Sequence, residues 1–310
     1  MPTVLEKLIV DFLEYLEVER GRSEKTIQNY HFYLRRFAKW ANYPAPQDIS
    51  DNLIHRYRLW LNRSVEGRDA EPLKRSTQNY HLIALRTFLK FLARKDIRSL
   101  ASEKIELAKQ EQREVEFLEV DELDRLLLQP KRVKEGLIAL RDQAILELLF
   151  STGLRVSELS KLKIDQINLK RDEFTVRGKG GKLRVVFLSS TAKETLREYL
   201  SKRRDPCIFL FVGHDRAKGG RETVEGLTPR SIQRLVEFYA KAAGITKHIT
   251  PHTLRHTFAT DLLLGGADIR SVQSLLGHAS ITTTQIYTHV TNTQMKMVYQ
   301  KFHGKSRKNV

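Results

Sequence analysis

Cysteine is nearly absent from this chain, whose 310 residues include only Cys207. A single cysteine excludes an intrachain disulfide and fits a protein of a reducing compartment. Long hydrophobic runs are missing too, since no stretch approaches the ~18 apolar residues of a membrane span. Residues 1–21 form an amphipathic helical pattern with acidic side chains throughout, unlike a signal peptide. These absences predict a cytoplasmic protein that is not attached to a membrane.

Acidic residues are also fewer than basic ones. The chain has 54 lysines and arginines against 37 aspartates and glutamates, giving a net charge of +17 and an isoelectric point near 9.9. Residues 1–110 hold 20 basic and 14 acidic residues, and residues 111–310 hold 34 and 23. This balance favours a polyanionic partner, first of all nucleic acid, contacted by both halves. Ribosomal and other RNA-binding proteins share such a charge, so charge alone does not identify the ligand.

Residues 3–95 predict four helices and no strand. Apolar residues recur at helical spacing from Val4 to Leu16, and Gly21 ends this first stripe. The inward face of the fourth helix, near 76–93, is predicted to comprise Tyr80, Ile83, Ala84, Phe88 and Leu92. Basic residues on the second and fourth helices are candidates for contacts with DNA phosphates, although solvated helix faces have the same composition: Arg35, Arg36, Lys39, Arg86, Lys90, Arg94 and Lys95.

A second domain is predicted to follow a charged segment, 101–116, which lacks glycine and proline and suits a linker or a solvated helix. Beyond it, a glycine-rich turn joins two predicted strands near 173–178 and 183–188. Thr228 and Pro229 begin a later helix. Its candidates for reading base edges in the major groove are Arg230, Gln233 and Arg234.

The predicted fold class is therefore mainly α. We expect an N-terminal helical-bundle domain at 1–100, a linker at 101–116, and a mainly helical domain with a small antiparallel sheet at 117–310.

The densest group of reactive side chains lies in residues 250–290. His252 and Arg255 share one face of a predicted helix, His278 follows the end of the next helix, and Tyr287 comes nine residues later. The cap and stop signals of these helices are Thr250, Pro251, Gly265, Gly266, Asp268 and Gly277. Such a set suits a pentacoordinate phosphorane: arginine neutralises non-bridging oxygens, histidine shuttles a proton, and tyrosine attacks phosphorus.

A zinc site is the alternative use of the same residues, because His252 and His256 have the i, i+4 spacing of a helical metal pair. The metalloprotease motif needs glutamate after the first histidine, where this chain has Thr253. A structural zinc site would lack cysteines. The turn at 178–181 lacks the G-x-x-x-x-G-K-[ST] spacing of a nucleotide-binding loop. We therefore predict no metal and no nucleotide cofactor.

Four separated motifs resemble the tyrosine recombinase (phage integrase) family. They are TGLRVSEL at 152–159, GKG at 178–180, the H-x-x-R of His252 and Arg255, and LGHASITTTQIYTHV at 276–290. They occur in the family's order, and their wording is most similar to that of the Xer recombinases. In this family the N-terminal helical unit is a core-binding domain, one half of a clamp around the duplex.

The resemblance implies roles for individual residues. Tyr287 would attack the scissile phosphate, His252 would transfer a proton, and Lys179, with Lys182 as the alternative, would protonate the departing 5′ oxygen. Two arginines would clamp the phosphate and a second histidine would hydrogen-bond it. The implied catalytic set is Arg155, Lys179, His252, Arg255, His278 and Tyr287, with Glu158 supporting the first arginine. No cofactor is implied.

The function that the resemblance implies is site-specific recombination of double-stranded DNA through a 3′-phosphotyrosine intermediate, in Xer-like dimer resolution or in mobile-element integration. Two alternative functions are a type IB topoisomerase and a non-catalytic DNA-binding protein. Thr291 or Asn292 begins a predicted last helix, which the resemblance implies packs into a neighbouring subunit in a homo- or hetero-tetramer on DNA. Its apolar stripe is Met295, Val298, Tyr299 and Phe302.

Overall fold

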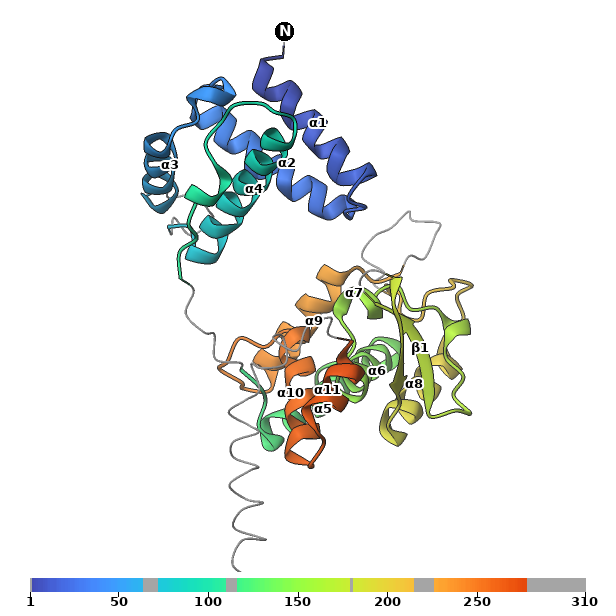
Figure 1. The fold of residues 1–310 in the computed structure, drawn as a ribbon. Coiled ribbons are helices and arrows are strands. Elements are labelled where there is room, and N and C mark those ends of the chain that lie inside the picture. The colour runs from blue at the N-terminus through green and yellow to red at the C-terminus, as the bar shows by residue number, and fades with distance from the viewer. Residues whose placement is uncertain (1, 64–71, 110–115, 179–180, 215–225, 278–310) are drawn as a thin grey trace, which may run out of the picture. The chain divides into compact units, whose positions relative to one another are not determined.

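The computed structural model describes residues 2–63, 72–109, 116–178, 181–214 and 226–277. The chain divides into two compact units, Met1–Gln112 and Arg113–Val310 (Figure 1). As predicted, the described residues are mainly helical and form one two-stranded antiparallel sheet. Each unit has its own large hydrophobic core. None of the described helices combines the length and the hydrophobicity that a membrane span requires.

The described part of the first unit contains four α-helices, and the first two begin at local capping signals. The Thr3 hydroxyl accepts a hydrogen bond from the Glu6 backbone N–H at 3.2 Å, and the Glu6 carboxylate accepts one from the Thr3 N–H at 2.8 Å. This capping box begins the first helix, and Ser23 caps the second. The elements are α1 (Val4–Val18), α2 (Glu24–Trp40), η1 (Pro46–Asp48), α3 (Asp51–Arg63), α4 (Arg75–Arg94) and η2 (Ser102–Lys104).

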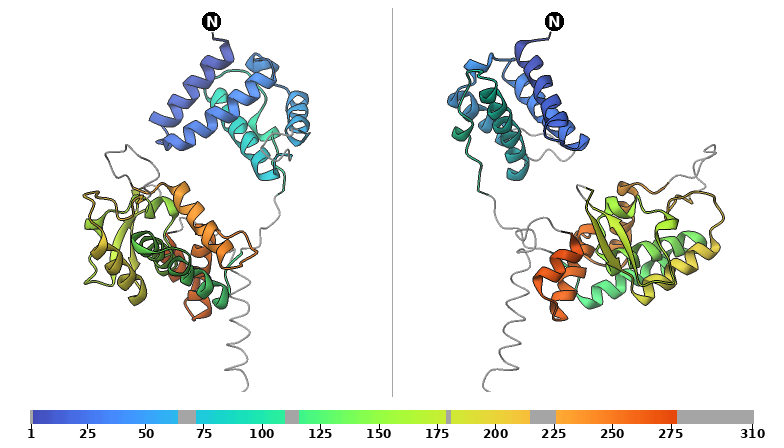
Figure 2. Two further views of the ribbon diagram at one scale, coloured as in Figure 1. Left: turned by 180° about the vertical axis from the view of Figure 1, so that it is seen from behind. Right: turned by 45° about the vertical axis from the view of Figure 1, so that its right-hand side comes forward.

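The central helix of this unit is α4, which contacts α1, α2, α3 and η2. In both views of Figure 2, α1, α2 and α4 lie side by side. Among the residues predicted to face inward, Ala84, Phe88 and Leu92 are buried, but Tyr80 is 55% exposed. The prediction for Tyr80 was wrong because the buried face of α4 centres on Leu85, Phe88 and Leu92, and the helical period places Tyr80 just outside that face. A helix with neighbours on several sides buries more, and its Asn79, His81, Leu82, Leu85, Leu89 and Phe91 are also buried.

Part of the segment predicted as a linker packs with the first unit. The η2 turn contacts α4, and Ile105 is fully buried in the core of this unit. The Asn79 side chain donates to the Ala108 carbonyl at 2.8 Å and accepts from the Ala108 N–H at 3.0 Å. Residues 110–115 lie outside the described part of the chain.

The second unit surrounds α6, which contacts α5, α8, α10 and β2. The hairpin pairs Glu173 with Phe187 and Arg177 with Leu183 at its two ends, within two residues of the predicted strand limits. The elements are α5 (Val120–Val133), α6 (Gly136–Thr152), α7 (Val156–Leu159), η3 (Ile164–Gln166), β1 (Glu173–Arg177), β2 (Leu183–Phe187), α8 (Ser190–Lys202), α9 (Pro229–Ala242), α10 (Pro251–Leu264) and α11 (Ile269–Leu276).

Two left-handed glycines set the ends of helices in this unit. Gly153 ends α6 with φ +58°, and a Cβ there would lie 2.5 Å from a ring carbon of Phe258. Gly277 ends α11 with φ +63°. Residues that carry a side chain rarely adopt this backbone conformation. The sharp turn at Gly153 places Arg155 at the start of α7, and the predicted stop at Gly277 is confirmed.

Candidate active site

Arg155 is the N-cap residue of the short helix α7 and is held by Glu158. Its backbone N–H donates to one Glu158 carboxylate oxygen at 2.9 Å, and its Nη1 donates to the other at 2.9 Å. Its Nη2 donates to the Gly277 carbonyl at 3.2 Å. The side chain remains 25% exposed. Arg155 is therefore fixed at two points and still accessible to an anion from solvent.

Arg255 lies on α10 and connects the ends of two other helices. Its Nη1 donates to the Gly153 carbonyl and its Nη2 to the Leu276 carbonyl, both at 2.6 Å. The residue is only 4% exposed. Its positive charge is thus placed where α6 and α11 both end, within the same cluster as Arg155.

Arg184 on β2 is a third arginine of this cluster, and sequence reasoning missed it. Its Nη1 and Nη2 donate to the two Glu158 carboxylate oxygens at 2.9 and 2.8 Å, and its Nε donates to the Leu275 carbonyl at 3.0 Å. Three consecutive carbonyls at the end of α11 therefore accept hydrogen bonds from three different arginines. The last carbonyls of a helix have no intrahelical partner and carry its negative dipole end, so cations are favoured there.

Glu158 is the carboxylate at the centre of these contacts. Burial of its side chain opposes ionisation, but hydrogen bonds from Arg184 and from Arg155, together with the charge of Arg184, outweigh it and lower the pKa of Glu158 to about 2. The carboxylate is therefore ionised at neutral pH. It is 7% exposed, so its partners are these arginines rather than solvent.

His252 lies in the first turn of α10, where the predicted Thr250 cap and Pro251 are confirmed. Partial desolvation of its ring, although the residue keeps an exposed surface, and the positive charges of Arg255 and Arg155 lower the pKa of His252. Its imidazole is therefore neutral at neutral pH and can accept a proton. Burial, the neighbouring His252 and the charge of Arg255 also lower the pKa of His256, to about 4. In the described parts of the chain, no group of three or more metal-ligating side chains gathers.

Three predicted catalytic residues, Lys179, His278 and Tyr287, lie outside the described residues. The described sequence neighbours of Lys179 and His278 reach the arginine cluster. The Gly178 N–H donates to the Lys182 carbonyl at 2.8 Å, and a Cβ on Gly178 would lie 3.5 Å from a Glu158 carboxylate oxygen. Gly277, which precedes His278, binds Arg155 through its carbonyl.

Comparisons with known proteins identify the family of this chain. The profile of the phage integrase family matches residues 116–294, and that of the phage integrase N-terminal SAM-like domain matches residues 9–96. Tyrosine recombinase XerD of Listeria innocua is 37% identical over 314 residues, which cover 97% of this chain and 100% of that protein. Tyrosine recombinase XerC of Pelobacter propionicus is 39% identical, over 96% of this chain and 95% of that protein. The chain belongs to the phage integrase family.

It is a tyrosine recombinase, a site-specific enzyme of DNA breaking and rejoining, and its relatives carry Xer names. Among solved structures, that of the XerH site-specific recombinase bound to palindromic difH substrate in a post-cleavage complex superimposes with a TM-score of 0.71. That similarity covers 90% of this chain and 80% of the other at 23% identity, and it shows a shared fold.

The candidate DNA-contact residues of the recombinase are mostly exposed. On the first turns of α9, Arg230 and Arg234 are exposed and Gln233 is half-buried. In the first unit, Arg36 is half-buried, with its guanidinium 4.9 Å from the centre of the Trp60 ring, so part of its role is packing. The exposed candidates there are Arg35, Lys39, Arg86, Lys90, Arg94 and Lys95.

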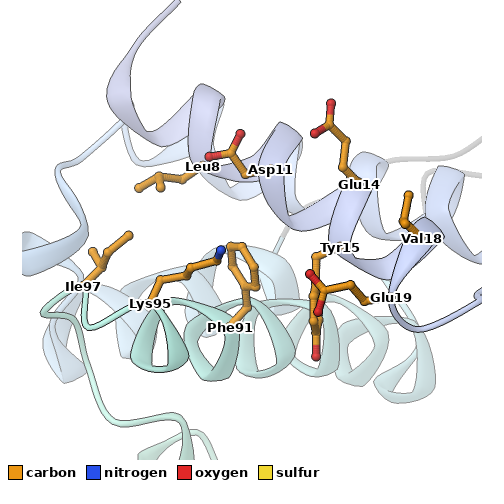
Figure 3. A pocket seen from close by; sticks show the side chains of 9 residues that line it. All are labelled: Leu8, Asp11, Glu14, Tyr15, Val18, Glu19, Phe91, Lys95 and Ile97. Carbon is orange, nitrogen blue, oxygen red and sulfur yellow. The ribbon is translucent and has the colours of Figure 1, made fainter.

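The first unit of the recombinase also has a hollow between α1 and the end of α4, shown in Figure 3. Apolar atoms of Leu8, Tyr15 and Phe91 line it, and Lys95 is the one base among its lining residues. Its acids are Asp11, Glu14 and Glu19. Like charges repel, so this face is unsuited to a phosphate backbone. Of the candidate DNA contacts, Lys95 lines this hollow, which weakens its case.

Proposed function

We propose that the Tyr287 hydroxyl attacks the scissile phosphate, so that a 3′-phosphotyrosine bond forms and a 5′ hydroxyl leaves. The observation that supports this most is the convergence of Arg155 and Arg255 at the end of α11, immediately before His278. His252, on the same helix as Arg255, lies close enough for both charges to lower its pKa. A 5′ hydroxyl of a second strand then attacks the phosphotyrosine and releases the tyrosine. The phosphotyrosine retains the energy of the broken bond, so this cycle needs no metal, nucleotide or other cofactor.

Charge stabilisation would come from the arginines. The phosphorane carries more negative charge than the diester, and guanidinium groups match pairs of phosphate oxygens. Arg155 has the exposed donor surface for such an oxygen, whereas Arg255 adds its charge and anchors the end of α11. His278 would complete the site with a hydrogen bond to the phosphate.

Two proton transfers accompany the exchange. An unperturbed tyrosine has a pKa of ~10 and is mostly protonated at neutral pH, so the attack needs an acceptor. His252 is suited to this, because its lowered pKa keeps it neutral. Lys179 would supply the proton to the departing 5′ oxygen. Lys182, on the same hairpin, is the alternative acid.

The biological role that we propose is Xer-like resolution of chromosome or plasmid dimers in the cytoplasm, where the DNA lies. Relatives named XerD and XerC align over almost the whole chain with similar identity, 37% and 39%, which supports an Xer-type role without favouring either name. Integration of a mobile element uses the same chemistry and differs in the target. The position of the gene relative to a chromosomal or mobile-element site distinguishes the two.

Both units would grip the DNA. We assign core binding to residues 1–100, with which the first part of 101–116 packs, and catalysis to 117–310. The rest of 101–116 would connect the two. Phosphate contacts would come from the exposed bases of α2 and α4, and α9 would enter the major groove with Arg230, Gln233 and Arg234. The XerH comparison structure contains a DNA substrate, which supports a DNA-binding role for this fold. On paired sites, the predicted helix after residue 290 would link four protomers.

A covalent-capture experiment tests this function. The target duplex is first selected by the protein from a random-sequence library, and a nicked version then traps the cleaved state. Wild-type protein should attach to the 3′ end of the nicked duplex. Tyr287→Phe should abolish attachment and leave binding of the intact duplex nearly unchanged, because only the nucleophilic oxygen is removed.

Tyr299→Phe is the matched control and should attach like wild type. Attachment of the Tyr287→Phe protein would show that another residue is the nucleophile. A wild-type protein that never attaches, although it binds the selected duplex, would favour the non-catalytic alternative. Relaxation of supercoiled plasmids that lack the target would favour the topoisomerase reading.

A further inference from the structure

Arg184 connects three parts of the second unit that carry the proposed active site. It lies on β2 of the hairpin, binds both carboxylate oxygens of Glu158 near the start of α7, and binds the Leu275 carbonyl at the end of α11. Its side chain also packs against Gly277, where a Cβ would lie 2.9 Å from the Arg184 Cδ. A single side chain therefore fixes the hairpin, the Arg155–Glu158 pair and the turn before His278 relative to one another.

Burial separates the roles of the two arginines that share Glu158. The Arg184 side chain is 9% exposed, whereas that of Arg155 is 25% exposed. Arg184 uses all three of its guanidinium nitrogens on protein oxygens. It is therefore placed to hold other groups, and Arg155 is placed to meet a ligand.

The charges of the cluster give Arg184 a specific task. A lone Arg155–Glu158 pair would be neutral, and an ionised carboxylate beside the phosphate-binding arginine would compete with the phosphate for its donors. Arg184 brings a second positive charge and binds Glu158 in the bidentate geometry that a carboxylate accepts best. The Arg155–Glu158–Arg184 group then keeps a net positive charge.

We propose that Arg184 is a positioning residue of the recombinase: by binding both carboxylate oxygens of Glu158, it limits the pull of this carboxylate on Arg155 and keeps the exposed surface of Arg155 available to the scissile phosphate. The inference rests on the proposed function, in which Arg155 binds that phosphate. Loss of Arg184 leaves a buried carboxylate with Arg155 as its remaining cationic partner. Arg155 is drawn toward Glu158, and the transition state loses its donor.

The test measures three quantities for the full-length protein: the single-turnover rate of covalent attachment to the nicked target duplex, the Kd for the intact duplex, and the thermal unfolding midpoint. The variants are Arg184→Gln, Arg184→Lys, Glu158→Gln, and the double variant Glu158→Gln with Arg184→Gln. Arg197→Gln is the matched control, because it removes one positive charge from an exposed position of α8.

Arg184→Gln should slow attachment by about 100-fold with Kd close to wild type, since misplacement of a positioned group by about 1 Å has an effect of that order. The attachment rate of Arg184→Lys should lie between those of wild type and Arg184→Gln, because lysine keeps the charge and loses the bidentate contact. The double variant should attach faster than Arg184→Gln, because the unpaired carboxylate is gone. Arg197→Gln should match wild type.

Attachment at the wild-type rate by Arg184→Gln would overturn the proposal. So would a loss that appears entirely in Kd, or a double variant no faster than Arg184→Gln, since the effect would then pass through α11 alone. If Arg184→Gln unfolds below the assay temperature, Arg184→Lys at full stability decides: a slowed rate supports the proposal, and an unchanged rate overturns it. Wild-type protein that fails to attach would instead remove the proposed function itself.

Discussion

Gly153 shows how a residue without a side chain can position two that carry charge. Its φ of +58° ends α6, and its carbonyl accepts a hydrogen bond from Arg255 at 2.6 Å. Two residues later the chain reaches Arg155 at the start of α7. A Cβ at this position would meet the Phe258 ring at 2.5 Å, so both the backbone conformation and the space exclude a side chain. The local geometry of Gly153 therefore determines where Arg155 lies and supplies Arg255 with one of its hydrogen-bond acceptors.

Gly153→Ala should lower the free energy of unfolding of the second unit by about 2–4 kcal/mol. About 1–2 kcal/mol would come from the left-handed conformation and the rest from overpacking against Phe258. The matched control is Gly244→Ala after α9, where φ is +70° and no atom lies within 4 Å of an added Cβ. It should lose only the conformational part. Calorimetry of the full chain measures the free energy of unfolding of both variants. Equal losses in the two would show that packing against Phe258 contributes nothing.

Short-range residue signals were predictable from the sequence, and contacts across the chain were not. Thr250, Asp268 and Gly277 act through neighbours within one turn, so the cap chemistry is visible in the sequence and is confirmed. Arg184 binds Glu158 from 26 residues away, and an arginine on a short strand has no periodic pattern that marks it as buried. Its role required the hairpin to be placed against α7 and α11.

At the scale of elements, the accuracy of the predicted burial depended on how many faces of a helix are buried. α1 follows one apolar stripe and was predicted from its spacing, with Leu5, Ile9, Phe12 and Leu16 buried. α6 has neighbours on several sides and buries charged residues as well. Its Arg141 donates to the Val212 carbonyl at 3.0 Å, and its Asp142 accepts from the Tyr239 hydroxyl at 2.8 Å. The sequence predicts a helix there but does not show which distant groups satisfy its charges.

The last predicted element, the helix after residue 290, lies outside the described residues and stays a prediction. A chain ending at Val290 should bind a single half-site almost like wild type but lose cooperative binding to paired half-sites and strand exchange. The physical reason is that the apolar stripe of Met295, Val298, Tyr299 and Phe302 would be buried against a neighbouring protomer. Gel-shift titration of single and paired half-sites measures the change.

A chain ending at His303 is the control, because it keeps the stripe and removes only the basic tail. It should retain most of the cooperativity. If the chain ending at Val290 instead loses its cooperative melting transition, the segment belongs to the core of its own unit, and the exchange between protomers is excluded.

At the scale of the whole molecule, charge is the property that both units share. The net charge of +17 is spread over both halves of the sequence, and each unit has its own core and its own match to the phage integrase family. The acidic hollow of the first unit shows that this charge is not uniform over its surface. A two-sided grip on DNA therefore predicts that selected basic side chains of both units, rather than total charge, determine binding.

Salt dependence tests that grip. Each neutralised phosphate contributes a slope of ~0.9 to the fall of log K with log salt concentration, because binding releases condensed counterions. Wild-type protein should show a steep slope.

Two variants assign the slope to the two units. One changes the first unit, with Arg35→Gln, Arg86→Gln and Lys90→Gln, and the other changes α9, with Arg230→Gln and Arg234→Gln. Each should lower the slope by up to about 0.9 per lost contact. Arg197→Gln should leave the slope unchanged, since Arg197 is not among the predicted phosphate contacts and its loss changes no number of neutralised phosphates. If only the α9 variant changes the slope, the first unit does not contact phosphates through these residues, and a slope near zero for wild type contradicts the two-sided grip altogether.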